Sequence, residues 1–362
     1  MKNVHGDILF ICSGAGHVHR GYETHMTDLF DILNKDGSSN LFFLKGGGIN
    51  SENSKRIYCI KRNSLIAKLI LKISGKPEYL TEQISFFFAS IIFILKNKPS
   101  IIYCADFILL RLYVILKRIF KMQYKTILCN GGNYKPPYFG IDKVQFVLEE
   151  HAKKVDFENK VIIPHGFDCT KYSPRKTKNE YREALGLPQG KKIVLSVGAI
   201  NSSIKRMDYL INEISTMDDE NVFLLILGQR DRESDFIENL AMVKLRKNYL
   251  IKTVTYEKIP DYYNASDIFC SASLNETFGK SYIEAALTQL PIIVHDFSTS
   301  RQVTGNYANY IDMKGPFMFK KILTDMIYSE ANNNVIQCES FVKFNFCWEN
   351  LLSRYKAMLF NN

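Results

Sequence analysis

The chain has 362 residues, of which 46% are hydrophobic, and a formal net charge of +10. This length exceeds one ordinary core and suits two domains of about 150–200 residues each. The near-average glycine and proline content argues against a long disordered segment. No run reaches the roughly 20 apolar residues of a spanning helix, so we expect the apolar runs 84–95 and 107–116 to be buried helices.

Eight cysteines are spread along the chain without a CxxC pair, which argues against a zinc ribbon. Several of them, such as Cys12 and Cys270, lie in apolar runs, where a thiol behaves as a small hydrophobe. The first residues do not have the layout of a signal peptide. Together these features predict a cytoplasmic protein.

The positive charge is concentrated in residues 51–125, which contain 14 basic and 4 acidic residues interleaved with Phe, Ile and Leu. Such a block attracts anionic lipid or nucleic acid. The sequence has no RNP motif or zinc-finger spacing, so we do not expect a nucleic-acid partner. We therefore expect a peripheral protein on the inner face of the cell membrane, attached through 51–125.

In the first half, short apolar strands alternate with helical segments. Strands are predicted at 7–12, 41–44, 101–104 and 126–129, and the first amphipathic helix at 22–33. A glycine-rich turn containing Gly14 and Gly16 follows the first strand. Strands that alternate with helices predict a parallel sheet with right-handed crossovers.

The same alternation resumes after a polar stretch at 172–190. Strands are predicted at 192–197, 223–227, 268–272 and 291–295, with helices at 207–214, 235–242 and 281–287. The fold class is therefore α/β, with two Rossmann-like domains. Ligands of such sheets lie beyond the carboxyl ends of the strands, so we expect a cleft there between the two domains.

Residues 271–296, SASLNETFGKSYIEAALTQLPIIVHD, contain the most informative motif. Glu276 lies in a loop after a strand, and Glu284 lies about one turn inside the helix that starts near Lys280. A helix N-terminus binds phosphate, and Gly279 lets the backbone approach a ligand closely. Two flanking carboxylates would accept hydrogen bonds from the hydroxyls of a nucleotide sugar. The alternative is that both glutamates only favour the helix start through its dipole.

This motif closely resembles the E-x-F-G-x-x-x-x-E motif of family 4 glycosyltransferases, which have the GT-B fold. The resemblance extends over most of the chain. Further stretches similar to family motifs are 20–25, 161–174, 197–210, 224–229, 262–273 and 346–355. It implies an N-terminal acceptor-side domain at 1–172, a nucleotide-sugar domain at 173–340, and a C-terminal helix at 341–362 that crosses back to the first domain.

The resemblance also implies roles for individual residues. Glu284 would bind the ribose, Glu276 would lie against the donor sugar, and Lys205 would stabilise the leaving phosphates. Backbone N–H groups for the sugar and diphosphate would come from Phe278, Gly279, Lys280 and Ser281, with Gly14 and Gly16 facing the diphosphate. The implied reaction is metal-independent, retaining transfer of a hexosyl group, with a UDP- or GDP-sugar as donor and no cofactor. The acceptor would be lipid-linked or a polysaccharide or lipopolysaccharide intermediate.

Two departures from the family pattern affect these roles. Ala199 stands where the family usually has Arg, and we expect Arg206 or Arg20 to supply the missing cation. The family commonly has a His near the end of a first-domain strand, where this chain has Asn130. Asn130 could hydrogen-bond an acceptor but cannot act as a base.

Some of the histidines could be interpreted as metal ligands, an interpretation that we do not favour. His17, His19 and His25 lie near the first glycine loop, but the sequence does not place a further ligand beside them. We expect His165 to be structural. The chain lacks an Asp-x-Asp motif, so we expect no metal site.

Three other functions remain open. A nucleotide-sugar epimerase of the same fold fits the glutamate motif less well. A glycosyltransferase-like binding subunit without activity fits Ala199 and the missing histidine. A nucleic-acid-binding protein is the weakest of the three.

Overall fold

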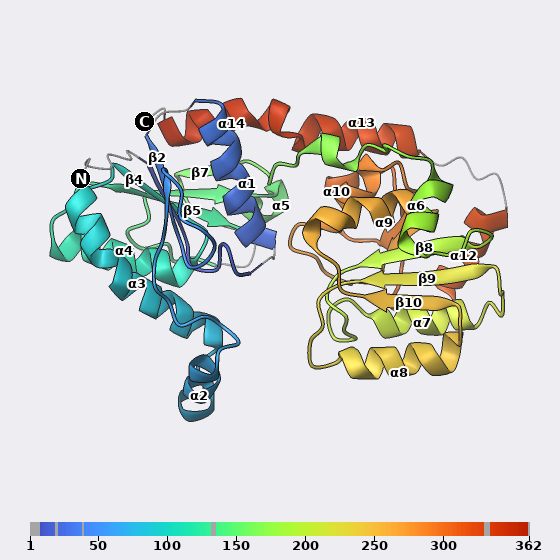
Figure 1. Cartoon of the computed structure of the whole chain (residues 1–362). Helices are drawn as coiled ribbons and strands as arrows, with labels where there is room; N and C mark the ends of the chain where they lie inside the picture. Colours follow the sequence, from blue (N-terminus) through green and yellow to red (C-terminus); the bar gives the residue numbers. More distant parts are fainter. Residues whose placement is uncertain (1–7, 19–20, 38–39, 132–134, 329–333, 361–362) are drawn as a thin grey trace. The chain divides into compact units, whose positions relative to one another are not determined.

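A computed structural model describes residues 8–18, 21–37, 40–131, 135–328 and 334–360 (Figure 1). The chain forms two compact units. Unit 1 comprises residues 1–166 and 348–362, and unit 2 comprises residues 167–347. The chain thus changes unit at Gly166–Phe167 and at Cys347–Trp348, whereas the sequence predicted domain boundaries after 172 and after 340.

Unit 1 contains a parallel sheet of seven strands in the order β3-β2-β1-β4-β5-β6-β7. In chain order the strands are β1 (Ile8–Cys12), β2 (Leu41–Lys45), β3 (Ser54–Arg56), β4 (Ile101–Cys104), β5 (Lys125–Asn130), β6 (Lys143–Phe146) and β7 (Lys160–Ile162). From β1 the chain first adds strands on one side and then continues on the other side with β4. The carboxyl ends of β1 and β4 therefore form the topological switch point, where open parallel sheets bind ligands.

Helices cover both faces of this sheet, which explains why its strands are almost continuously apolar. Leu9 and Ile11 pack on the side of α3 and α4, whereas Ile8 and Phe10 pack on the side of α1 and α14. The helices of unit 1 are α1 (Gly21–Lys35), α2 (Leu65–Ser74), α3 (Glu78–Asn97), α4 (Phe107–Ile119), α5 (Glu149–Lys153) and α14 (Trp348–Phe360).

Helix α3 differs from the buried helix that the sequence predicted at 84–95. It is the one helix among the described residues that is long and apolar enough to cross a membrane, and 33% of its most apolar window is buried. Phe86 and Ile94 are in the core, while Phe88 and Ile92 are 66% and 77% exposed. The helix therefore packs on the sheet through one face only.

Unit 2 contains a parallel sheet of six strands in the order β10-β9-β8-β11-β12-β13. The strands are β8 (Lys192–Val197), β9 (Val222–Leu227), β10 (Tyr249–Lys252), β11 (Ile268–Ser271), β12 (Ile292–His295) and β13 (Asn309–Ile311). Its switch point lies between β8 and β11. Most strands and helices predicted from the sequence are present in both units, whereas the short strands β3, β6, β7, β10 and β13 were not predicted.

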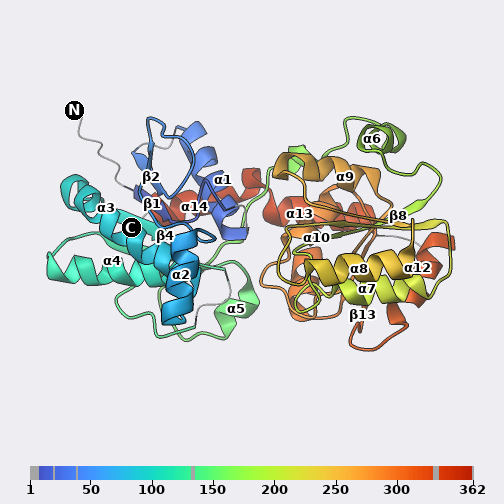
Figure 2. The same ribbon diagram turned by 60° about the horizontal axis from the view of Figure 1, so that its bottom comes forward.

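Helices α7, α8 and α12 cover one face of the second sheet, and α9, α10 and α13 lie on the other (Figures 1 and 2). The helices of unit 2 are α6 (Lys178–Leu185), α7 (Met207–Ser215), α8 (Ser234–Leu245), α9 (Ile259–Ala265), α10 (Lys280–Leu287), α11 (Ser298–Thr304), α12 (Met318–Tyr328) and α13 (Val335–Phe346). The segment expected to be one C-terminal helix is thus two helices: α13 belongs to unit 2 and α14 to unit 1.

The cysteine pattern holds a feature that the sequence did not indicate. Cys169 and Cys347 form a disulfide across 178 residues of sequence. Both lie close to the positions where the chain changes unit. The other cysteines of the described residues are buried, as the apolar runs predicted for Cys12 and Cys270.

Candidate functional site

The loop from β11 to α10 forms the centre of the candidate site in unit 2. It leaves the switch point after Ser271 and ends at Gly279, the N-cap of α10. Gly279 has φ 75°, and a Cβ there would lie 2.8 Å from the Tyr282 ring. Both constraints require glycine. Because Gly279 has no capping side chain, the first N–H groups of α10 are available to an anion.

Glu284 lies one turn inside α10 and is 5% exposed. Its Oε2 accepts a hydrogen bond of 2.9 Å from the Tyr263 hydroxyl, and the nearby Tyr172 side chain lowers the pKa of the carboxyl. Burial raises the pKa of the Glu284 carboxyl, and the Tyr263 hydrogen bond partly opposes that rise. A ligand whose hydroxyl groups donate two further hydrogen bonds to Glu284 would favour the ionised form of the carboxyl.

Lys205 and Glu276 meet at the same switch point. The aliphatic chain of Lys205 passes directly over Gly198. A Cβ atom added at Gly198 would lie only 2.8 Å from Cε of the lysine, so this close approach depends on glycine. The ammonium group then forms an ion pair with Glu276, and both side chains are largely buried. The residues predicted to stabilise the phosphates and to contact the sugar are therefore brought together, although their roles stay predictions.

Asn201 positions Lys205, a role that the sequence did not reveal. It is 2% exposed, and its Oδ1 accepts hydrogen bonds from the backbone N–H groups of Ile204 (3.2 Å) and Lys205 (2.8 Å). Its Nδ2 donates to Asp231 at 2.7 Å. An Asn-Ser-Ser run is an ordinary loop signal, so only the fold shows that this side chain shapes the loop.

Ser273 is a second residue that the sequence did not single out. It follows β11 and is fully buried. Within the described ranges its Oγ has no hydrogen-bond partner. A buried hydroxyl without a partner costs about 1–3 kcal/mol, so Ser273 is a candidate to bind a polar ligand atom at the switch point.

Arg206 does not join this group, although it was expected beside Lys205 as a catalytic cation. Its backbone has φ 50°, and its guanidinium donates to the carbonyl oxygens of Met313 (2.7 Å) and Ala272 (3.4 Å). It also stacks on Tyr209, with Cζ 4.6 Å from the ring centroid. These contacts describe a residue that stabilises the unit.

The backbone groups expected from 278–281 lie at the start of α10. The Phe278 side chain is buried, so the group that it can offer to a ligand is its backbone N–H. The carbonyl of Ser281 accepts from Tyr263 at 3.2 Å. Lys280 lies with its ammonium 5.6 Å from the centroid of the Phe167 ring. Their contacts with a ligand remain predictions.

In unit 1, the glycine turn lies at the other switch point. A Cβ at Gly14 would lie 2.8 Å from Glu23 and 2.9 Å from Arg62. Gly16 has φ 84°, and its Cβ would lie 2.4 Å from Gly47. Gly16 is thus required by its backbone conformation and by the backbone of Gly47, whereas a side chain at Gly14 would displace the Glu23 and Arg62 side chains. The contact of both glycines with a diphosphate stays a prediction.

A buried charged network supports the Gly14 turn, and it was not predicted. Ser13 donates its N–H and hydroxyl to Asp106 (3.2 and 3.1 Å) and lies 3.2 Å from Glu82. Arg62 donates to Glu82 at 2.6 Å and to Glu23 at 3.0 Å. These residues come from five separate places in the sequence, so no local motif predicts the network.

The three carboxyl groups of this network differ in the direction in which their pKa values are shifted. Burial raises the pKa of Glu23 and Asp106, partly offset by Arg62 and by Ser13 respectively. Burial also acts on Glu82, but hydrogen bonds from His17 and Arg62 outweigh it and lower its pKa to about 2. The ion pair of Arg62 with Glu82 is thus the firm centre of the network.

The two acceptor-side predictions have different outcomes. Asn130 ends β5, is 1% exposed and donates to the Tyr138 hydroxyl at 3.0 Å, so it is part of the packed interior. Arg20 lies outside the described residues, as does His19. The proposed acceptor-side contacts of Asn130 and Arg20 stay predictions.

His25, Cys129 and His165 form the group whose donor atoms could hold a metal ion, all within 4.8 Å of one another. The two imidazoles stack with centroids 3.9 Å apart and an interplanar angle of 17°. Nitrogen lone pairs lie in the ring plane, so near-parallel stacked rings do not aim them at one point between the rings. His25 also stacks on Trp348. The arrangement is that of a packed core cluster, as expected for His165.

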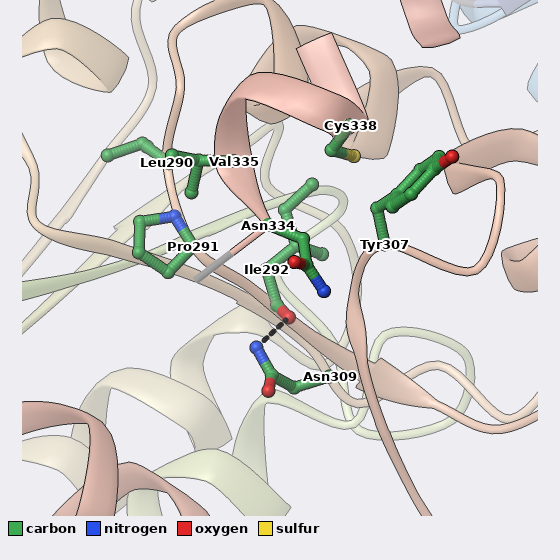
Figure 3. A pocket seen from close by; sticks show the side chains of 8 residues that line it. All are labelled: Leu290, Pro291, Ile292, Tyr307, Asn309, Asn334, Val335 and Cys338. Carbon is green, nitrogen blue, oxygen red and sulfur yellow. Dashed lines mark hydrogen bonds between the residues drawn. The ribbon is translucent and has the colours of Figure 1, made fainter. Parts of the chain in front are cut away.

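A small hollow lies between the start of β12 and α13, lined by apolar side chains, Tyr307, Asn309 and Asn334 (Figure 3). Its volume is about 10 Å³, enough for about one water molecule. It is at the amino end of β12, away from the switch point. We assign no ligand to it.

Comparison with known proteins agrees with this geometry. A model of the family described as glycosyl transferases group 1 matches residues 177–330. The chain is 30% identical over 206 residues to the lipopolysaccharide core biosynthesis mannosyltransferase LpsB of Rhizobium meliloti, covering 53% of the chain and 58% of that protein. It is 27% identical over 158 residues to the alpha-monoglucosyldiacylglycerol synthase of Streptococcus pneumoniae, covering 42% and 35%. These alignments span about a third to three-fifths of the relatives' own lengths.

The fold is matched over nearly the whole chain. The structure of HepE from Anabaena, in complex with UDP and glucose, has a TM-score of 0.76 at 13% identity and covers 98% of this chain and 99% of that one. The GT-B fold that the sequence predicted is therefore confirmed. Residues 177–330, which include β8 to β13 and the loop at Glu276, match the model of the glycosyl transferases group 1 family, and the chain has the GT-B fold.

Proposed function

We propose that this chain is a retaining, metal-independent glycosyltransferase that takes a hexosyl group from a UDP- or GDP-sugar. The observation that carries the proposal is the convergence of three features at one switch point: the start of α10 at Gly279, the buried Glu284, and the Lys205–Glu276 pair. They match the needs of a diphosphate, a ribose and a sugar. The family match of residues 177–330 supports the same reading.

The chemistry follows from the charge that develops on the leaving diphosphate. Fixed N–H groups and a cation stabilise this charge without reorganising during the reaction, which is the largest effect available to such a site. The N–H groups at the start of α10 and the ammonium of Lys205 would do this. Glu276 holds Lys205 in place and would accept hydrogen bonds from the donor sugar.

The acceptor class is inferred from relatives and from the surface of unit 1. The names of two relatives refer to a lipopolysaccharide core and to a glucosyldiacylglycerol. Leu65, Leu69 and Ile73 of α2 are 85%, 57% and 78% exposed, and the exposed Lys68 and Lys72 lie on the same helix. We propose a lipid-linked or lipopolysaccharide-type acceptor, reached from the cytoplasmic surface of an anionic membrane.

A thermal-shift screen of the whole chain against UDP, GDP, ADP and their sugars, with and without EDTA, tests the donor assignment. A ligand that binds the folded state raises the melting temperature. We expect a shift with a uridine or guanosine diphosphate that EDTA does not change and that Glu284→Ala removes. Loss of the shift in EDTA would contradict the metal-independent site, and the lack of any shift would contradict nucleotide binding itself.

Two alternatives are separated by turnover. Ala199 and Asn130 stand where the family that the sequence resembles usually has an arginine and a histidine, which would suit a binding subunit. Nucleotide-sugar binding without release of the diphosphate in the presence of glycolipid acceptors would support that subunit. Interconversion of the donor sugar while it stays attached to the nucleotide would support an epimerase.

A further inference from the structure

We propose that the Cys169–Cys347 disulfide is a reversible clamp that holds the nucleotide-sugar site of unit 2 in its binding geometry. This inference rests on the proposed function, because it assigns a regulation to the same site. All the residues involved belong to unit 2.

The disulfide fastens the two ends of unit 2 to each other. Phe167 donates its backbone N–H to the carbonyl of Phe346 at 2.8 Å, and Phe167 pairs with Cys347 in a parallel bridge. The bond between Cys169 and Cys347 closes the chain into a ring that includes nearly all of the unit. The entering and leaving segments therefore move as one body while the bond is intact.

The first connection to the site runs through Phe278. Phe167 stacks on it with ring centroids 6.4 Å apart, and Phe346 packs edge-on at 5.8 Å. The ammonium of Lys280 lies 5.6 Å from the centroid of the Phe167 ring. The two segments joined by the disulfide thus press on the residues on both sides of Gly279, where the backbone N–H groups for the diphosphate begin.

The second connection runs through Glu284. Cys169 opens a short 3-10 helix, Cys169–Tyr172, whose last residue lies close enough to the Glu284 carboxyl to lower its pKa. The Tyr172 ring also meets the Tyr263 ring edge-to-face at 6.2 Å, and Tyr263 donates a hydrogen bond to Glu284. A shift of Cys169 would therefore reach the ribose-binding side as well as the phosphate side.

The chemical step is thiol–disulfide exchange with a low-molecular-weight thiol such as glutathione. One glutathione thiolate attacks a sulfur of the disulfide, forms a mixed disulfide with that cysteine and releases the other cysteine as a thiolate. A second glutathione thiolate attacks the glutathione sulfur of the mixed disulfide and releases the remaining cysteine. Cys169 and Cys347 gain two electrons and two protons, and two glutathione molecules become one glutathione disulfide. In a cytoplasmic protein a disulfide is usually transient or redox-sensing, which suits a reversible clamp.

Cys338 provides a matched control. It lies on α13, is buried in the same unit, and does not take part in the disulfide. Burial raises the pKa of its thiol to about 12, so it carries little thiolate at neutral pH. Its substitution tests the loss of a buried thiol without touching the clamp.

The experiment compares the whole chain, equilibrated with glutathione disulfide or with dithiothreitol, in nucleotide-sugar binding and in diphosphate release. We expect the reduced wild type and reduced Cys338→Ser to bind the donor about 5-fold or more weakly than their oxidised forms, a typical coupling between sites. We expect Cys169→Ser and Cys347→Ser to bind as the reduced wild type does in both buffers. Alkylation and mass measurement should find two fewer reactive thiols in the oxidised wild type.

Two outcomes would overturn the clamp. One is alkylation of all eight cysteines in the denatured oxidised protein, which would show that the bond does not form. The other is equal donor affinity in the oxidised and reduced wild type. If instead no form binds a nucleotide sugar while the thiol count still falls by two, the proposed function fails and the disulfide remains.

Discussion

The ammonium group of Lys205 and the carboxylate of Glu276 form an ion pair at the carboxyl ends of β8 and β11. The pair joins positions 71 residues apart in sequence. It places a cation beside the start of α10, and Asn201 fixes the backbone that carries the lysine. This arrangement distinguishes Lys205 from the many other basic residues of the chain.

Replacing Lys205 with Ala should lower kcat for sugar transfer by about 10²–10³-fold, because a fixed group that stabilises developing charge has an effect of this size. The donor KM should change less. Steady-state kinetics measure both. Lys258→Ala is the control, since the Lys258 side chain is exposed and pairs with Asp261. A rate for Lys205→Ala close to that of the control would remove the lysine from the site.

Arg206→Ala should act on stability more than on rate. The guanidinium donates to the carbonyls of Met313 and Ala272, and their loss should lower the free energy of unfolding by about 1–3 kcal/mol. Denaturant unfolding measures this loss. We expect kcat to change far less than in Lys205→Ala. A fall in kcat as large as that of Lys205→Ala, with unchanged stability, would restore the sequence-based view that Arg206 is catalytic.

The contrast between these neighbours shows what the sequence could and could not provide. Glu276, Gly279 and Glu284 lie within one strand–loop–helix segment, so their proximity could be predicted from local pattern. The inward direction of Arg206 depends on its positive φ and on the carbonyl of Met313, 107 residues away. Neither feature can be recognised from the sequence around Arg206.

The same distinction holds for larger features. The apolar strands near the centre of each sheet were predicted, whereas three-residue strands such as β3 and β13 carry too little pattern. The network of Arg62 with Glu23 and Glu82 unites residues 20 to 39 positions apart. The disulfide joins residues 178 apart. Such pairings depend on the tertiary fold.

Nucleotide affinity should depend on pH through Glu284. Burial raises its pKa, so Glu284 takes up a proton at a higher pH than an exposed glutamate does. As an acid with a raised pKa, it stabilises the fold at pH values below its unfolded pKa, and this contribution is lost as pH rises through the folded pKa. Ribose hydroxyls prefer the carboxylate, so binding should strengthen as pH rises through the same pKa.

Titration of the nucleotide dissociation constant between pH 4.5 and 8 would measure this dependence. We expect weaker binding at the acidic end for the wild type and a flatter profile for Glu284→Gln, whose amide does not titrate. Glu220→Gln, on the surface of the same unit, is the control. A profile for Glu284→Gln that equals the wild-type profile would show that another group controls the pH dependence.

Gly279→Ala should impair nucleotide binding because the site lacks room and the backbone lacks the conformation for a side chain. The left-handed φ of 75° costs about 1–2 kcal/mol for a residue other than glycine, and the new Cβ would lie 2.8 Å from the Tyr282 ring. We expect a lower melting temperature and at least a tenfold weaker affinity for the nucleotide. Gly315→Ala is the control, since a Cβ there meets nothing within 4 Å. Equal behaviour of the two variants would contradict the close fit at the start of α10.

Membrane binding should depend on the exposed apolar face of α2. Leu65, Leu69 and Ile73 are exposed, and each side chain could contribute about 1.5–3 kcal/mol if fully transferred from water. Lysines near an anionic surface add about 1 kcal/mol each. The triple change to Ser should lower partition into vesicles of phosphatidylglycerol and phosphatidylcholine at least tenfold, measured by co-sedimentation.

Salt and a matched variant separate the two contributions to this binding. High salt should weaken the electrostatic part for the wild type and the triple variant alike, because it screens exposed charges. Ile336→Ser removes an apolar side chain that is 64% exposed on α13, outside the basic block, and should leave vesicle binding unchanged. If Ile336→Ser and the triple variant bind vesicles as the wild type does, α2 is not the membrane-binding element. If the wild type binds purely zwitterionic vesicles as strongly as vesicles that contain phosphatidylglycerol, the basic residues of 51–125 do not select an anionic surface.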